Sequence, residues 1–546
     1  MTHFLAPKTR FVTMTSVAAL MAVAMSGTSA QAACTEMLAG TVATTTCMGT
    51  SDKGYFESAG TNTTSVTVLA GATVNNDIAE IIAIKLIGSG DSLLNYGKIG
   101  ATPKTKTGVL MSGNVGVIND GSGVIAGDNI GIDVKDVPIQ GVRIVNDAFI
   151  SGNKDAGIKL SNAEAAVIDN GATGKISSLS GDGIKVESKS GQSLTINNKG
   201  TFEGKTSAIF GSDGNETIAN TGLIQGNVVL GQGVSFIENG TNTNATAKIE
   251  GGIFTGGGAD RVYNYGKITA DINLGNGNNI LVNNEKGVIG PIGMAGLIDL
   301  GTGDDQVENK GIMNTNIALG NGANILTNSA GGKIDGSITA GTGNDTVTNS
   351  GRIGGNISLG DGDNKLTLNM GMSVGGTISG GIGNDSLILS NSVIGGQQVF
   401  KNQVTGVENL VVDTTTSTDK WVLDADYTFT SGSLIKFGGL EIRRGWTLES
   451  TVTLNGSKGT DSALLSGEGT IKGDLVVTKG VVRAGNGLTG TLSVTGNYTN
   501  SADGVLEVAV GPGSDQTRLA VTGDVNLGGN GTLRVTVAPG FYKGNA

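Results

Sequence analysis

The sequence predicts an all-β protein, specifically a right-handed parallel β-helix with about 20 residues per coil. Three observations carry this prediction. A glycine-rich template restarts six times between Leu274 and Leu389, short segments alternate apolar and polar residues, and the chain has 93 glycines but only 6 prolines in 546 residues. Glycines this frequent would each cost about 1 kcal/mol inside a helix, which argues against a helical solenoid.

The template reads Gly-x-Gly-x-(Asn/Asp), two or three residues, an aliphatic residue, Asn, Gly, x and Ile. Its copies begin 26, 19, 21, 19 and 21 residues apart. Self-similarity at such a period, punctuated by Gly and Asn, is typical of a solenoid. The copies begin at Gly275, Gly301, Gly320, Gly341, Gly360 and Gly381.

Each part of the template has a structural reason. Alternating segments such as 356–359 place one face of a strand inward. The Gly-x-Gly pairs supply backbone with positive φ, so that the chain turns a corner. One coil cannot bury its inner face alone, whereas stacked coils form a continuous core. The Asn before a turn glycine should then form a hydrogen-bonded amide ladder between coils; it occurs at Asn264, Asn309, Asn328 and Asn349.

Composition and charge narrow the function classes. Glycine enrichment with little proline disfavours collagen and proline-rich linkers. The net charge is −11, and removal of the first 32 residues, which carry Lys8 and Arg10 but no acid, leaves −13. Scattered basic residues on an acidic chain disfavour nucleic acid as a partner, because phosphate binding requires clustered Lys and Arg.

Residues 1–32 have the features of a secretory signal peptide. Lys8 and Arg10 form a positive segment, Val17–Met25 forms an apolar one, and Ala30-Gln-Ala32 fits the small-x-small cleavage pattern. The apolar run is short for a membrane span. We therefore predict cleavage between Ala32 and Ala33.

The only two cysteines, Cys34 and Cys47, follow at once. In an oxidising compartment, two cysteines that close a small loop most simply form a disulfide. This disulfide would staple an N-terminal cap, residues 33–60, where the first coil has no neighbour above it. Two unpaired thiols remain the alternative, and a metal site is disfavoured because no histidine is nearby.

The rest of the chain divides into two parts. Residues 61–400 are predicted to form the Gly/Asn-rich β-helix, with a loop from Lys135 to Gln140, around Pro138, that interrupts a coil and is suited to partner contacts. After Gly396 the period weakens, and both tryptophans, Trp421 and Trp446, appear. Residues 401–546 should therefore have a wider or more irregular core.

The C-terminal stretch carries the most specific family signal. Four segments resemble the passenger-associated repeat of bacterial autotransporters: Leu465-Ser-Gly-Glu-Gly-Thr-Ile-Lys-Gly-Asp-Leu-Val-Val, Gly485-Asn-Gly-Leu-Thr-Gly-Thr-Leu-Ser-Val-Thr-Gly-Asn-Tyr, Leu506-Glu-Val-Ala-Val-Gly-Pro-Gly-Ser-Asp and Leu519-Ala-Val-Thr-Gly. The segment from Gly531 to Tyr542 resembles the junction just before that family's translocator. The resemblance is specific over about residues 460–546 and generic over the solenoid. One departure is the missing Pro in the turn Gly485–Gly490.

The resemblance implies an architecture of signal peptide, β-helical passenger, autochaperone-like junction within 401–546, and a C-terminal outer-membrane β-barrel, whose strands are absent from this sequence. On this basis the chain looks truncated. The resemblance also implies type V secretion through the periplasm to the outer membrane and cell surface, where the passenger is displayed or shed. We expect an adhesin or interaction rod, with an unknown host or bacterial surface ligand and its own barrel as partners.

A catalytic function is not expected. The single histidine, His3, lies in the predicted signal peptide, so the mature chain can form neither a Ser-His-Asp triad nor a His-ligated zinc site. Gly90-Asp-Ser-Leu93 spells a block found in esterases, but it also falls on the coil template. Asp304-Asp305 is a paired-acid candidate for a polysaccharide-acting enzyme, which needs two carboxylates at a set separation across a cleft.

Calcium binding is the remaining alternative. Gly380-Gly-Ile-Gly-Asn-Asp385-Ser-Leu-Ile fits the nonapeptide of calcium-binding β-rolls, with near matches through Asp345 and Asp305. Calcium takes six to eight oxygens, and β-rolls gather them from motifs roughly nine residues apart, whereas here the motif comes about once per coil. We therefore expect no metal and no cofactor. Lys472-Gly-Asp474 resembles an integrin-type tripeptide, which a junction turn also explains.

Overall fold

The computed structural model describes residues 34–39, 42–57, 63–77, 81–135, 140–162, 165–187, 193–291, 296–391, 396–416, 418–458, 461–512, 515–528 and 531–540. The predicted cleavage site at Ala32 and Ala33, the residues 136–139 around Pro138, and the end of the predicted junction at 541–542 lie outside the described residues.

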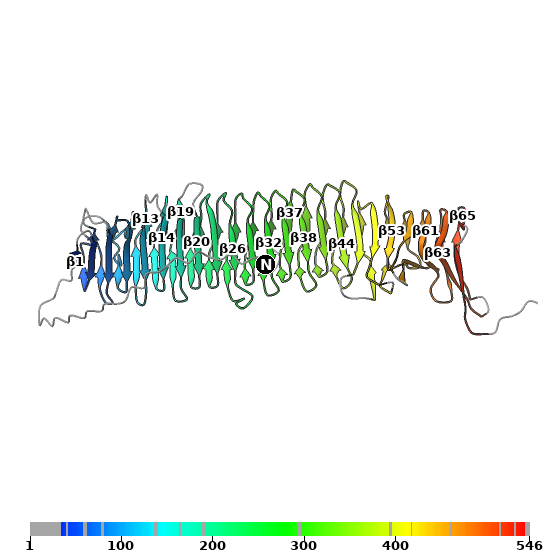
Figure 1. The fold of residues 1–546 in the computed structure, drawn as a ribbon, viewed down its shortest axis with the longest axis horizontal. Helices are drawn as coiled ribbons and strands as arrows, with labels where there is room; N and C mark the ends of the chain where they lie inside the picture. The colour runs from blue at the N-terminus through cyan, green and yellow to red at the C-terminus, as the bar shows by residue number, and fades with distance from the viewer. Residues whose placement is uncertain are drawn as a thin grey trace, which may run out of the picture.

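The chain folds as an all-β solenoid of about 20 turns with roughly 23 residues per coil, which confirms the predicted fold class. Figure 1 shows the coils stacked in chain order from β1 at one end of the rod to β65 near the other. No helix of the described segments is long and apolar enough to cross a membrane.

Each coil of the central rod contributes one strand to each of three parallel sheets. In one coil, β35 (Gln306–Asn309) lies in the first sheet, β36 (Ile312–Met313) in the second and β37 (Asn316–Gly320) in the third. The next strand of the first sheet, β38 (Ile325–Asn328), pairs with β35 in parallel, so that Gln306 lies opposite Ile325. Over the described segments, the three sheets contain 28, 15 and 16 strands.

The coils are longer than the predicted 20 residues because their strands and turns differ along the rod. In the third sheet, β13 (Ile130–Val134) and β16 (Ala156–Ser161) have five and six residues, whereas β28 (Ile253–Phe254) and β31 (Ile272–Asn273) have two. Equivalent residues of successive coils are accordingly separated by as many as 28 positions in the N-terminal half and as few as 19 in the central repeats. The prediction was made from the central copies, which are the shortest.

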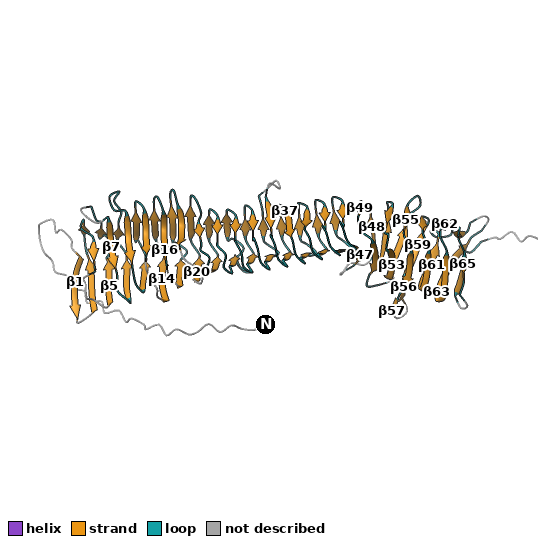
Figure 2. Cartoon of the chain, turned by 90° about the horizontal axis from the view of Figure 1, so that it is seen from above, coloured by secondary structure: helices purple, strands orange, loops and turns teal. Residues whose placement is uncertain are grey.

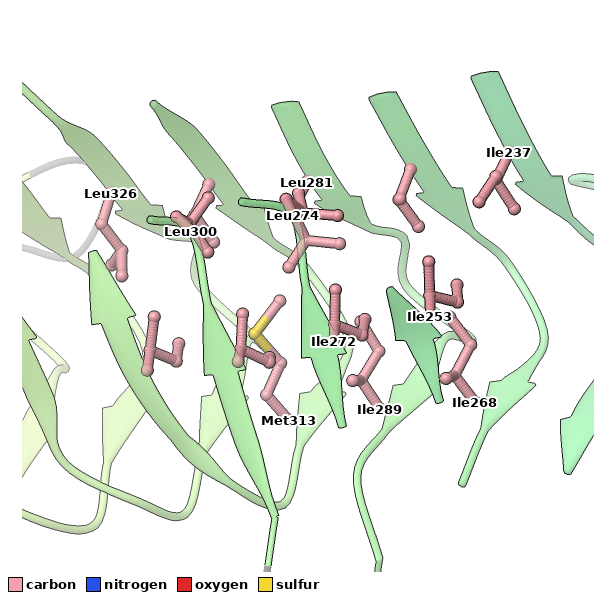
Figure 3. Packing of buried hydrophobic residues seen from close by; sticks show 14 of the residues in the cluster. Ile237, Ile253, Ile268, Ile272, Leu274, Leu281, Ile289, Leu300, Met313 and Leu326 are labelled. Atoms are coloured by element: carbon pink, nitrogen blue, oxygen red, sulfur yellow. The ribbon is translucent and has the colours of Figure 1, made fainter. Parts of the chain in front are cut away.

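The core is a set of aliphatic rows that run along the rod axis. Ile268, Ile289 and Met313 follow one another in the second sheet, and each is fully buried. Figure 3 shows their side chains facing those of the first and third sheets across the interior. Because each inner face is covered by three sheets and two neighbouring coils, small aliphatic side chains suffice to fill it.

A ladder of asparagine side chains runs beside this core at the corner between the first and second sheets. Each Nδ2 donates to the Oδ1 of the next asparagine at 2.7 to 2.9 Å, and each side chain is at most 1% exposed. The ladder predicted from four asparagines is therefore confirmed, and it is longer than predicted. Its members are Asn95, Asn119, Asn146, Asn170, Asn198, Asn220, Asn239, Asn264, Asn283, Asn309, Asn328 and Asn349.

The N-terminal end of the rod is covered by an antiparallel strand. β1 (Cys34–Ala39) runs against β2 (Val42–Cys47), with Cys34 opposite Cys47, and β2 pairs in parallel with β5 (Thr63–Val68). The two cysteines form a disulfide in the structure. The bridge therefore ties β1, which has a neighbour on one side only, to the first coil.

Reduction of this disulfide should loosen the first coil and leave the rest of the rod intact. A loop of 13 residues corresponds to roughly 3 kcal/mol of stabilisation on chain-entropy grounds. In a Cys34→Ser/Cys47→Ser variant we expect faster amide hydrogen exchange in β2 and β5 and unchanged exchange in β23 (Asn215–Asn220). Equal protection of β2 and β5 in both proteins would contradict this expectation.

The cross-section changes in the C-terminal section. The second sheet ends at β45 (Ser373–Val374) and the third at β49 (Val404–Thr405), and a five-stranded sheet begins with β52 (Tyr427–Thr428). Figure 2 shows this section at one end of the rod. Phe400 packs edge-on against the fully buried Trp421 and stacks on Tyr427, with ring centroids 6.3 and 5.3 Å apart, so large rings fill this core, as predicted.

Candidate functional site

The Gly-x-Gly template forms the corner between the third and the first sheet. Gly301 and Gly303 adopt φ values of +84° and +132°, which side chains with a Cβ rarely adopt. The predicted turning role of these glycines is therefore confirmed. The fifth residue of each template is buried inside the corner, at most 2% exposed. We call these residues the corner row: Asp260, Asn279, Asp305, Asn324, Asp345, Asn364 and Asp385.

Hydrogen bonds link the corner row from coil to coil. The Oδ1 of each residue from Asn279 onward accepts the backbone N–H of the corner-row residue one coil earlier, at 2.7 to 3.0 Å. At the two ends, Asp260 Oδ1 accepts the N–H of Ser235, and the Asp385 N–H donates to Glu408 Oε2. The corner row is therefore a second polar ladder, built from side chain to backbone.

Asp304 and Asp305, the paired-acid candidate, do not share a cleft. Asp305 is 2% exposed and accepts the N–H of Asn279, whereas Asp304 is exposed and accepts the N–H of Ala323 at 2.7 Å. Burial, with Asp304 and Asp299 adding smaller effects, raises the pKa of Asp305 to about 7. A carboxyl that is enclosed and already bound to backbone cannot reach a glycosidic bond, so this pair does not support polysaccharide cleavage.

The β-roll motif is likewise occupied by internal contacts. Asp385 is fully buried and accepts the N–H of Asn364 at 2.8 Å, and Asp345 and Asp305 make the equivalent bonds. Among the described residues there is no group of three or more His, Cys, Asp or Glu that could hold a metal ion. These carboxyls serve the stacking of coils, which removes the motif's support for calcium binding.

The other two short motifs also lie in the coil framework. Asp91 is buried and accepts the N–H groups of Thr64 and Gly88, and Ser92 shares a hydrogen bond with Ser65 of the neighbouring coil at 2.9 Å. His3 lies outside the described residues.

In the integrin-type tripeptide, Lys472 pairs with Glu449 at 2.8 Å, and Asp474 Oδ1 accepts the N–H of Asn497 at 2.7 Å. Both charged side chains of the tripeptide are therefore engaged within the rod.

A cavity of about 380 Å³ lies on the outer face of the C-terminal section. Parallel register brings Glu441, Ser466, Arg483 and Glu507 into one row across four strands, β54 (Gly439–Ile442), β59 (Leu464–Gly467), β61 (Leu475–Ala484) and β63 (Tyr498–Val510). Lys420 pairs with Glu441, and Arg483 pairs with Glu507 at 2.8 Å. The cavity is polar, but these ion pairs compensate the charges that line it.

The sequence analysis missed both the corner row and this cavity. The signal for the corner row was present, because its members alternate strictly between Asp and Asn from Asp260 to Asp385. The sequence gave no comparable signal for the cavity, because its row depends on the register between coils of unequal length. No family model matches the chain, and no curated protein matches it.

Proposed function

We propose that the chain is the passenger, with its junction, of a bacterial autotransporter, and that it acts as an adhesive or interaction rod without catalysis. The observation that carries this proposal is the continuity of the rod. The segments that resemble the autotransporter junction, from Leu465 onward, form the last coils of the same stack: β61 pairs with the preceding β59 and the following β63. An exported rod completed by such a junction is what the resemblance implies.

The physical mechanism follows from the solenoid. The inner face of each coil is stabilised by its neighbours, so coils add most readily to an existing end. The C-terminal section is suited to fold first, because its rings bury more apolar surface than aliphatic coils do and because β61 and β63, at 10 and 13 residues, are the longest strands among those described. In this proposal, the section emerges at the cell surface and templates the coils that precede it.

The rod would bind its partner through its exposed faces and turns. Each coil adds about 4.8 Å to its length, so the repeat places binding surfaces at a distance from the membrane and offers them many times. The acidic balance of the mature chain keeps nucleic acid out of the proposal, and the ligand class stays open between host and bacterial surface molecules.

The gene sequence beyond the codon for Ala546 is the direct test. An open frame that encodes about ten alternating apolar and polar segments with aromatic girdles would support the proposal, because a barrel of that kind is the translocator of the family. A stop codon at this position would contradict display by this route.

Deletion of residues 465–546 from the full gene product should reduce surface display and leave the exported chain sensitive to protease. The matched control removes residues 301–340, two coils that end where the template restarts, so the stack remains in register. We expect this shorter rod to be displayed and protease-resistant. Normal, protease-resistant display of the 465–546 deletion would show that the section does not template folding.

A further inference from the structure

The four aspartates of the corner row differ from its three asparagines in one respect. In the asparagines, Nδ2 donates to glycine carbonyls of the same corner: Asn324 donates to Gly320 and Gly322 at 3.2 and 3.1 Å, and Asn364 donates to Gly360 and Gly362 at 3.2 and 3.0 Å. Asp260, Asp305, Asp345 and Asp385 carry an Oδ2 in place of this Nδ2. All four Oδ2 atoms are buried and lack a hydrogen-bond partner within the described structure.

The local frame is the same in both kinds of corner. Asn324 follows its two template glycines by four and two residues, and so does Asp305, whose glycines are Gly301 and Gly303. Oδ1 also has the same role in both, because it accepts a backbone N–H from the preceding coil. A carboxylate Oδ2 would place charge in a dry corner whose nearby acceptors are carbonyls. A carboxylic acid would place a donor there, as asparagine does.

We infer that Asp260, Asp305, Asp345 and Asp385 are held as neutral carboxylic acids whose Oδ2–H donates to glycine carbonyls, so that the coils between them form a stack that is closed by protons and loosened by alkaline pH. This goes beyond the proposed function, because it concerns the rod wherever it is located. Ionisation releases the Oδ2 proton to solvent and leaves a buried charge, which costs far more than a neutral group unless it is paired.

The charged groups around these carboxyls favour the neutral form. Asp305 faces Asp304 and Asp299, and Asp385 faces Glu408 and Asp363. Asp260 acts on the buried Glu216, whose own pKa is raised to about 7, mainly by burial. The cations on the adjoining strands, Arg261 and Lys365, are exposed on the outer face. The strongest charged neighbours of Asp305 and Asp385 are thus acids, which oppose ionisation.

Burial raises the pKa of all four aspartates above the ordinary value of 3.8, to about 7 for Asp305. For a group whose folded pKa is raised, the stabilisation is fully present below the unfolded pKa and is lost as pH rises through the folded pKa. Between pH 5 and pH 7, Asp305 alone should shift the unfolding equilibrium about a hundredfold toward the unfolded chain.

The test compares the full chain with its Asp305→Asn/Asp345→Asn/Asp385→Asn variant by denaturant unfolding from pH 4.5 to pH 8.5. Asparagine already occupies this position in the alternate coils, so the variant should fold. We expect the two proteins to differ little at pH 4.5, and the variant to become progressively more stable than the wild type as pH rises. Asp304→Asn, which changes the exposed neighbour, should leave the pH profile of the wild type unchanged.

Two further measurements keep the inference open to refutation if unfolding is not cooperative. The infrared carbonyl band of protonated carboxylic acids should be present in the wild type at pH 6 and reduced in the triple variant. Asn324→Asp, which adds a fifth acid to the row, should steepen the pH dependence. Parallel stability profiles for wild type and triple variant, or no protonated-acid band at pH 6, would overturn the inference.

Discussion

Gly301→Ala is expected to destabilise the centre of the rod by about 3 to 5 kcal/mol. The backbone of Gly301 has a φ of +84°, and a Cβ at this position would lie 1.8 Å from the carbonyl oxygen of Gly275 in the preceding coil. The strained φ alone costs roughly 1 to 2 kcal/mol. The clash cannot be relieved by a side-chain rotation because the contacting atom is backbone, so the two coils must separate.

Amide hydrogen exchange across 275–283, 301–309 and 320–328 measures this effect coil by coil, and thermal unfolding measures it globally. Gly116→Ala is the matched control, because a Cβ there meets no atom within 4 Å and Gly116 is not among the glycines with positive φ. The control should be neutral or more stable by about 0.4 to 1 kcal/mol, since alanine restricts the unfolded chain. Wild-type protection in Gly301→Ala would refute the close-packing argument.

Asn283→Ala should cost about 3 kcal/mol, and Asn283→Asp should cost more at neutral pH. The fully buried Asn283 side chain donates to Asn309 Oδ1 at 2.9 Å and to the carbonyl oxygens of Gly287 and Ile312 at 3.1 Å, and it accepts from Asn264 Nδ2 at 2.9 Å. Alanine removes all four bonds. Aspartate additionally replaces the donor by an acceptor that faces three other acceptors, without a cation to pair with.

Denaturant unfolding at pH 7.5 gives the size of this loss, and hydrogen exchange in β29 (Arg261–Asn264) and β35 shows whether it spreads to neighbouring coils. Asn242→Ala, at an exposed turn position, should change stability by less than about 0.5 kcal/mol. The ladder would be energetically unimportant if Asn283→Ala behaved like Asn242→Ala.

The two polar ladders respond differently to the same exchange of residue types, which separates their roles. At the amide ladder, each side chain must both donate and accept along the axis, so asparagine is required and aspartate is excluded. At the corner row, the axial bond uses only Oδ1 as an acceptor, so either residue can make it. Alternation of Asp and Asn is therefore tolerated at the corner row, while the amide ladder is uniform for twelve coils.

The sequence by itself determined the fold class, the glycine corners and the amide ladder. These features repeat in every coil and depend on local chemistry: a positive φ at Gly301, an alternating strand, or an asparagine before a turn. Identical short-range rules applied many times leave a periodic signal that one sequence is enough to show. The same locality explains why the coil length was underestimated, since the prediction rested on the shortest copies.

Only the tertiary structure decided which face of the corner each acidic residue occupies and which residues of different coils meet. Asp304 and Asp305 are adjacent and chemically identical, yet one is exposed and the other enclosed. Likewise, Glu441, Ser466 and Arg483 form one row only because coils of different length stack in a particular register. Burial and inter-coil register arise from the packed neighbours of a residue, and the local sequence does not contain those neighbours.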